Sequence, residues 1–184
     1  MDINNDSTVN AADRVLLGNS FPKYTWSVGN TLSYKRFSLE VFIEGVNGVK
    51  MFNNNLADVY FPINFRRNKL AEPYLNRWTT KNPSEKYPSF ITPLSQGQKI
   101  INSYTVEDAS YLRLQTVTLS YSLPTLKKIF HSGTIYVTAQ NLFTLTNYTG
   151  MDPSVNPGGN ANFRVDFNAT PSTSNFLVGA NFDF

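Results

Sequence analysis

The residues whose types and spacing could do chemistry stand at the start of this sequence. Oxygen-bearing side chains occupy the first, third, fifth, ninth and twelfth positions of the twelve-residue stretch from Asp2 to Asp13. An EF-hand loop uses these positions, with a backbone carbonyl at the seventh, to surround calcium with oxygen ligands. The sequence therefore predicts a structural calcium ion, and its candidate ligands are Asp2, Asn4, Asp6, the Thr8 carbonyl, Asn10 and Asp13.

The same stretch departs from the EF-hand pattern at two positions. Ser7 stands where the sharp turn favours glycine, and Asp13 stands where the longer glutamate is usual. A surface loop in which Asn and Asp side chains bond their own backbone, as in Asx turns, explains the composition equally well. Both interpretations stay open, and the sequence indicates no other cofactor.

Enzyme chemistry has little support. The chain has a single histidine, His131, and no cysteine, and it contains neither a glycine-rich phosphate loop nor a nucleophile motif. Glu40 and Glu44 share one face of an expected strand, but charges facing the polar interior of a barrel explain them more simply than a catalytic pair. We predict no enzyme activity, and a net charge of +3 is too small to indicate nucleic-acid binding.

The last eleven residues, from Ser174 to Phe184, organise the rest of the chain. Apolar and polar residues alternate along this stretch, which is the length that a tilted strand needs to cross a bilayer. One face carries Phe176, Val178, Ala180, Phe182 and Phe184, so the chain stops on an aromatic residue at its apolar face. This pattern is typical of a closing strand of a membrane barrel, and we interpret these five residues as an assembly signal.

Four other segments show strand-like alternation. They are Tyr24 to Tyr34, Ser38 to Gly48, Ala109 to Leu123, whose first part is out of phase, and Gly133 to Phe143. The connections alternate strictly between short ones and loops of about sixty and about thirty residues. Outer-membrane barrels alternate in this way because short turns face the periplasm and long loops face outward. Tyr34, Phe37, Tyr121 and Phe184 should then form an aromatic girdle at the short-turn end.

The predicted fold is therefore all-β: an antiparallel transmembrane β-barrel fragment with about five C-terminal strands and two long extracellular loops. Five strands cannot close a barrel, and an open edge is not tolerated in lipid. We expect residues 1–184 to be the C-terminal portion of a larger barrel domain, with a plug and a signal peptide encoded upstream. The first long loop also holds aromatic and arginine side chains, including Tyr74, Arg77 and Trp78, which could stack on sugars or pack within the loop or against a lid protein.

Several segments, in the same order along almost the whole chain, resemble the C-terminal end of SusC/RagA-type TonB-linked outer-membrane proteins. The segments are Asp2 to Asp13 with Leu17-Gly18 and Pro22, Arg77-Trp78-Thr79 with Asn82-Pro83 and Tyr87-Pro88, Glu107 to Leu114, Gln140 to Thr144, Tyr148-Thr149-Gly150 and Asp152-Pro153. The resemblance implies a barrel of about twenty-two strands around a plug. It also implies a bacterial outer-membrane location, energised import of oligosaccharides or peptides through TonB, a SusD-like lipoprotein lid, and the barrel-assembly machinery and membrane lipid as further partners.

We interpret the chain as the C-terminal barrel segment of such a nutrient importer. The alternative, from another class, is a secreted β-sandwich that binds glycans in a calcium-dependent way. Detergent dependence separates the two, because a sandwich would be soluble without detergent. The sequence does not identify the transported substrate or the loop residues that contact it.

Overall fold

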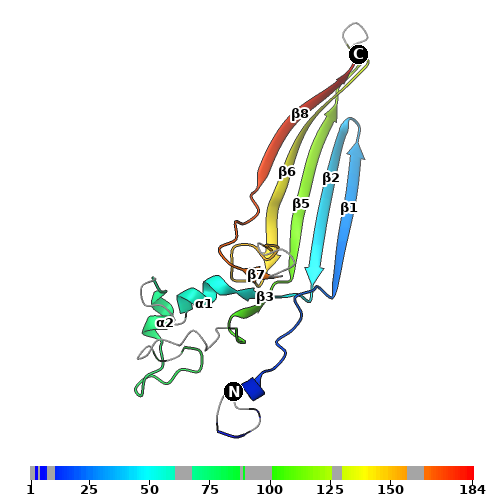
Figure 1. Cartoon of the computed structure of the whole chain (residues 1–184). Helices are drawn as coiled ribbons and strands as arrows, with labels where there is room; N and C mark the ends of the chain where they lie inside the picture. Colours follow the sequence, from blue (N-terminus) through cyan, green and yellow to red (C-terminus); the bar gives the residue numbers. More distant parts are fainter. Residues whose placement is uncertain are drawn as a thin grey trace.

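A five-stranded antiparallel sheet dominates the computed structural model, which describes residues 3, 5–7, 11–60, 68–87, 89, 101–125, 130–156 and 164–184. Its strands lie side by side in chain order (Figure 1). They are β1 (Tyr24–Tyr34), β2 (Phe37–Asn47), β5 (Tyr111–Ser122), β6 (Ser132–Thr146) and β8 (Asn175–Asp183). Each strand pairs with the next by simple antiparallel connections, as an up-and-down barrel wall requires.

A small second sheet lies at one end of the main sheet and is built entirely from the long loops. Its order is β4 (Val106–Asp108), β3 (Lys50–Asn53) and β7 (Val165–Asp166), with β3 and β7 parallel. The helices are short: the 3-10 turn η1 (Ala11–Asp13), α1 (Asn54–Tyr60) and α2 (Ala71–Leu75). No helix in the described part of the chain is long and apolar enough to cross a membrane.

The predicted strands agree with the structure to within a few residues. The expected strand from Tyr24 to Tyr34 has those bounds, and Tyr34 pairs with Phe37 across a two-residue turn in which Lys35 has a φ of 55°. A residue in the left-handed backbone conformation lets a two-residue turn follow the right-handed twist of the two strands that it joins. The fourth strand runs on to Thr146, three residues beyond the predicted end at Phe143.

The phase change expected at the start of the third strand has its origin in a bulge. Gln115 is an extra residue of β5 relative to β2, because Phe42 pairs with Thr116 while Ile43 pairs with Leu114. In β6 the irregularity falls between Gln140 and Phe143, where Asn141 has a φ of 53°. One extra residue moves every later side chain to the other face, so the bulge at Gln115 keeps the apolar residues of β5 on the same face as those of β2.

The two ends of the main sheet differ in character. The tight β1–β2 turn, the β5–β6 connection and the C-terminus lie at one end, whereas the N-terminus, both long loops and the second sheet lie at the other (Figure 1). The predicted alternation of short and long connections is therefore confirmed. The long loop before β5 contains β3, α1, α2 and β4, so it carries more regular structure than its polar composition suggests.

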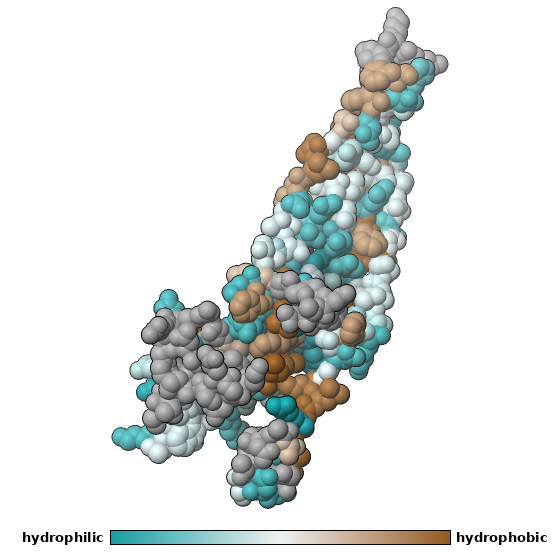
Figure 2. Space-filling view, in the orientation of Figure 1, coloured by the Kyte–Doolittle hydropathy of each residue, from teal (hydrophilic) through white to brown (hydrophobic). Residues whose placement is uncertain are grey.

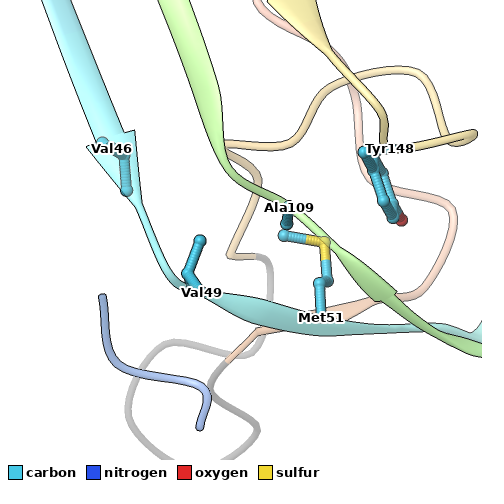
Figure 3. Packing of buried hydrophobic residues seen from close by; sticks show 5 residues of the cluster. All are labelled: Val46, Val49, Met51, Ala109 and Tyr148. Atoms are coloured by element: carbon cyan, nitrogen blue, oxygen red, sulfur yellow. The ribbon is translucent and has the colours of Figure 1, made fainter. Parts of the chain in front are cut away.

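The buried apolar core is small and lies where the main sheet meets the long loops. Val46, Val49, Met51, Ala109 and Tyr148 form it, and Figure 3 shows them converging from β2, β3 and the segments beside β5 and β6. The rest of the main sheet is a single layer: every residue of β1 and all but one of β8 are exposed. A β-sandwich would cover one face of this sheet with a second sheet, so the structure does not fit the sandwich alternative.

Candidate functional site

The main sheet has one apolar face and one polar face. The strand register places like residues opposite each other, so that Val41, Val117, Ala139 and Phe176 stand in one row across four strands. The adjacent row on the other face holds Glu40, Thr118, Thr138 and Leu177. In Figure 2 most of the sheet residues in view are hydrophilic or neutral, and hydrophobic residues gather near β3. This two-faced pattern is that of a barrel wall with lipid outside and water inside.

The apolar face is exposed on β1, β6 and β8 and half-buried along much of β2 and β5. Val28 on β1, Val137 on β6 and Val178 on β8 are 52%, 48% and 77% exposed. In a soluble domain so wide an apolar surface would be covered by protein. Its natural contact is therefore the hydrocarbon of a membrane.

The predicted aromatic girdle lies at the short-turn end. Tyr34 pairs with Phe37, and the rings of Phe37 and Tyr121 lie 4.7 Å apart between centroids. Phe184, directly after the end of β8, is 81% exposed at the same end. Aromatic rings prefer the boundary between hydrocarbon and water. This row therefore marks the periplasmic edge of the hydrocarbon layer.

The polar face is lined mainly by hydroxyl groups. The hydroxyls of Thr118 and Thr138 lie 2.9 Å apart, and Ser120 donates to the carbonyl of Ser38 at 3.3 Å. Glu40 and Glu44 are on this face, where Glu44 accepts a 3.3 Å bond from the Tyr111 hydroxyl. Two carboxylates along one strand of a polar wall, one of them bonded to a tyrosine, need no catalytic explanation.

At the loop end of the polar face, Arg113 of β5 holds the second long loop. Its Nη2 donates to Asp152 Oδ1 at 2.7 Å, and its Nη1 donates to the Ser154 hydroxyl at 3.1 Å. Its Nε donates to the Thr144 hydroxyl on β6 at 3.0 Å. Both members of the ion pair are buried, so each needs the other to offset the loss of water. This pair fixes the loop to the barrel wall.

A second group of contacts holds the two long loops together, with some bonds inside one loop and others between the two. The Tyr148 hydroxyl donates to Asp166 Oδ2 at 2.7 Å, and Asn55 of α1 donates to Asp166 Oδ1 at 3.1 Å. On the other side of β3, Asn53 donates to Glu107 at 2.9 Å, and the Thr149 hydroxyl donates to the same carboxylate at 2.7 Å. Because Asp166 and Asn53 are almost fully buried, their bonds are shielded from competing water, whereas the bond from Thr149 to Glu107 is exposed.

The surroundings of these groups shift their pKa values. Burial alone would raise the pKa of Asp152, but hydrogen bonds from the Ser154 hydroxyl and from the backbone amides of Ser154 and Ser172 hold it well below its ordinary value. Burial and the bond to Asp166 raise the pKa of Tyr148 well above its ordinary value. Asp152 therefore stays charged and Tyr148 stays neutral at any physiological pH.

A pocket of about 540 Å³ opens beside this loop assembly. Its apolar wall comes from α1 and its neighbours, with Leu56, Val59 and Leu70, while Asn55 and Asn168 supply amide groups. The pocket is large enough for part of a small ligand and offers more apolar surface than polar surface.

The comparisons agree with this geometry. No protein-family model matches the chain. TonB-dependent receptor P3 of Formosa agariphila is 29% identical over 192 residues, which cover 100% of this chain and 18% of the receptor. TonB-dependent receptor SusC of Bacteroides thetaiotaomicron is 24% identical over 189 residues, covering 100% of this chain and 17% of SusC. The solved RagAB peptide importer in its open-open state superposes with a TM-score of 0.72 at 28% identity, over 90% of this chain and 17% of the matched chain.

The chain is related to the SusC/RagA-type TonB-dependent receptors. The resemblance inferred from the sequence is thus confirmed, as are the all-β barrel-wall fold and the bacterial outer-membrane location. These relatives are described as receptors and importers rather than enzymes. The chain spans less than one fifth of the length of the curated relatives it matches.

The predicted calcium ligands fall mostly on undescribed positions: Asp2, Asn4, Thr8 and Asn10 lie outside the described residues. Asp6 is exposed, and Asp13 is buried and accepts a 2.7 Å bond from the backbone amide of Ile3. Within the described ranges no three His, Cys, Asp or Glu side chains gather as a metal site would require. The calcium site stays a prediction.

The arginine and aromatic residues of the first long loop are partly paired with each other. The Arg77 guanidinium lies 4.4 Å from the centre of the Tyr74 ring, and Trp78 is 42% exposed. Lys86 and the Tyr87 hydroxyl both bond Glu72, and these bonds lower the pKa of Glu72 below its ordinary value. Packing within the loop therefore accounts for several of these side chains.

Sequence reasoning missed the contacts that bind the loops to the wall. Arg113 and Asp152 both lie in the segments that carry the family resemblance, but they are 39 positions apart. The one charged residue in the expected strand from Ala109 to Leu123 is Arg113, and this is the signal that could have prompted a search for a carboxylate partner.

Proposed function

We propose that this chain is a C-terminal wall segment of an outer-membrane transporter that imports nutrients, oligosaccharides or peptides, in a TonB-dependent way. The observation that supports it best is the single-layer sheet with one exposed apolar face and one hydroxyl-lined face, ending in long loops on one side only. Such a wall separates lipid from an aqueous interior. A soluble binding module would instead cover the apolar face of such a sheet with protein.

The partners follow from the same proposal. The open edges of β1 and β8 would pair with the rest of the barrel, because unpaired strand edges are not tolerated in lipid. A SusD-like lipoprotein would cover the long loops from outside, and the TonB complex would act on a plug outside this chain. The barrel-assembly machinery would insert the whole barrel, and the chain itself catalyses no reaction.

Cysteine labelling of the full-length receptor tests the placement of the wall. The chain has no cysteine of its own, so single cysteines can be introduced at neighbouring positions on opposite faces. Thr138→Cys should react with a water-soluble maleimide that enters through the lumen, and Val137→Cys should be protected from the same reagent, because lipid excludes the reagent and disfavours the reactive thiolate. Equal labelling of both cysteines by the water-soluble reagent in folded protein would contradict the proposal.

Uptake by intact cells tests the transport itself. Deleting the full-length gene should abolish growth on one class among a panel of oligosaccharides and peptides. The complete gene should restore growth, whereas a version without its TonB-contacting segment should not. Full restoration by that version would rule out energised import.

A further inference from the structure

A groove of about 350 Å³ lies at the loop end of the apolar face, where β1, β2, β5 and β6 end. The floor of the groove is apolar and consists of Trp26, Leu112 and Leu145. Its rim is polar and uncharged and includes Asn47, Ser110 and Asn147, and Tyr111 and Thr146 complete the lining. The groove does not include the buried bonds of Asp152 and Asp166 that hold the long loops. It also lies on the opposite side of the sheet from the polar face, along which we propose that transport occurs.

The register explains why a hollow forms there. Trp26 pairs with Gly45, Gly45 with Leu112, and Leu112 with Leu145, so the floor is one row across four strands. Because Gly45 has no side chain, it leaves a gap in this row, and the indole ring of Trp26 fills part of that gap. A Cβ atom at position 45 would lie 2.2 Å from the ring. The Trp26 Nε1 donates to the Asn47 side chain at 3.0 Å, which holds the ring flat over β2.

The groove lies at the outer boundary of the membrane. Asn47 of the rim pairs with Tyr24, which lies on the same face of β1 as Tyr34 and ten residues from it. Ten residues correspond to about 33 Å along a strand and, at a tilt of about 40°, to about 25 Å along the membrane normal. An apolar band of a barrel is about 25 Å tall and is bounded by aromatic residues at both interfaces. With Tyr34 at the periplasmic edge of the hydrocarbon layer, the rim of the groove stands at the level where acyl chains meet headgroups.

We propose that this groove binds a glycolipid of the outer leaflet. Its first acyl methylenes would lie against the floor, and its sugar hydroxyl or amide groups would bond the side chains of the rim. Among the residues that the structure describes, no lysine or arginine lines the groove, so the rim suits an uncharged sugar better than a phosphate. Aromatic and amide side chains at a wet apolar boundary are suited to such a headgroup.

Native mass spectrometry of the full-length receptor in mild detergent tests this site. The probe is a synthetic diacylated glucosamine without phosphate, and phosphatidylglycerol is the competing lipid. The groove variant combines Leu145→Ala with Asn147→Ala. The chain offers a matched control, Leu32→Ala with Asn30→Ala, because this pair has the same residue types on the same face nearer the other end.

The wild type and the control should retain the glycolipid equally, and the groove variant should retain it at least fivefold less. Equal retention by all three proteins, or preference for phosphatidylglycerol, would mean that only annular lipid binds. If the double variant fails to fold, Asn147→Ala alone replaces it, since Asn147 is exposed. Nutrient uptake is measured in parallel, so a failed lipid site with intact uptake overturns this inference without affecting the proposed function.

Discussion

The side chains of Arg113 and Asp152 form a buried ion pair, 2.7 Å between Nη2 and Oδ1, that joins strand β5 to a loop 39 residues further along the chain. The carboxylate also accepts bonds from the backbone amides of Ser154 and Ser172, so one aspartate gathers both ends of its loop. The ion pair therefore links the sheet directly to the second long loop.

Removing one partner should free this loop. Asp152→Ala would leave the buried guanidinium without its counter-ion, which typically costs about 3–5 kcal/mol. We expect trypsin to cleave this loop after Arg164, its one basic residue, at least tenfold faster in the full-length receptor, with the barrel still folded. Replacing both residues, Arg113→Met with Asp152→Leu, should recover much of the protection. Equal cleavage of wild type and Asp152→Ala would show that the pair does not hold the loop.

Acid should not release the loop until the pH is well below the usual range for aspartate. Asp152 has its pKa lowered from 3.8, so its contribution to stability is present above that value and is lost as the pH falls through the lower folded-state pKa. Hydrogen exchange of residues 152–156, corrected for the intrinsic rate, should give the same protection at pH 7 and pH 4.5. Loss of protection between these two values would contradict the assignment.

The Tyr148 hydroxyl should contribute to the joint between the two loops. Tyr148→Phe removes a donor from the buried Asp166 carboxylate, and leaving a buried acceptor unpaired costs about 1–3 kcal/mol. We expect faster hydrogen exchange at β7 and at the start of α1. Tyr104→Phe is the control, because that hydroxyl donates to a carbonyl at an exposed site. The same exchange in both variants would remove Tyr148 from this role.

The last residue should matter for assembly more than for stability. Deleting Phe184 from the full-length receptor should lower the yield of folded outer-membrane barrel several-fold, because the assembly machinery is expected to recognise the closing strand by its aromatic end. Phe176→Ala, on the same face at the other end of β8, controls for lost apolar area worth about 1.5–3 kcal/mol. The yield is measured as the fraction of receptor in outer-membrane samples whose electrophoretic mobility changes on heating, which is a property of folded barrels. Equal losses of yield in both variants would make Phe184 an ordinary lipid-facing residue.

The N-terminal loop should bind calcium if the spacing of its oxygen-bearing residues from Asp2 to Asp13 forms a calcium site. Asp2→Ala with Asp6→Ala in the full-length receptor should abolish one calorimetric calcium site and leave barrel assembly intact. The matched control replaces Asn5 and Ser7, which lie between the predicted ligands. Absence of calcium binding by the native receptor would reduce the stretch to an Asx-rich turn.

The main sheet is predictable from sequence because alternation with a period of two is forced on any strand between lipid and water. Even the bulge at Gln115 leaves a trace, since Leu112 and Leu114 fall out of phase with Val117 and Leu119. The second sheet leaves none: β7 is two residues long, and its partner β3 lies more than a hundred positions earlier. Pairings of this kind depend on the folded loops and not on a local pattern.

The pairs within the loops escape prediction for a related reason. Asn53, Tyr148 and Asp166 are each unremarkable in a polar segment, and only the structure shows that they are buried. Burial gives them their importance, because a polar group without water must find its partner in the protein.

Because β3 pairs in parallel with β7 and Asn55 bonds Asp166, the two long loops are a single module for recombination between related receptors. In a chimera that exchanges only one loop, β3 and β7 would come from different receptors, and so would Asn55 and the buried Asp166 carboxylate that it bonds. A chimera that exchanges residues 48–110 together with 147–174 would carry both halves of every such pair. Over generations, the two segments should therefore be inherited and varied together.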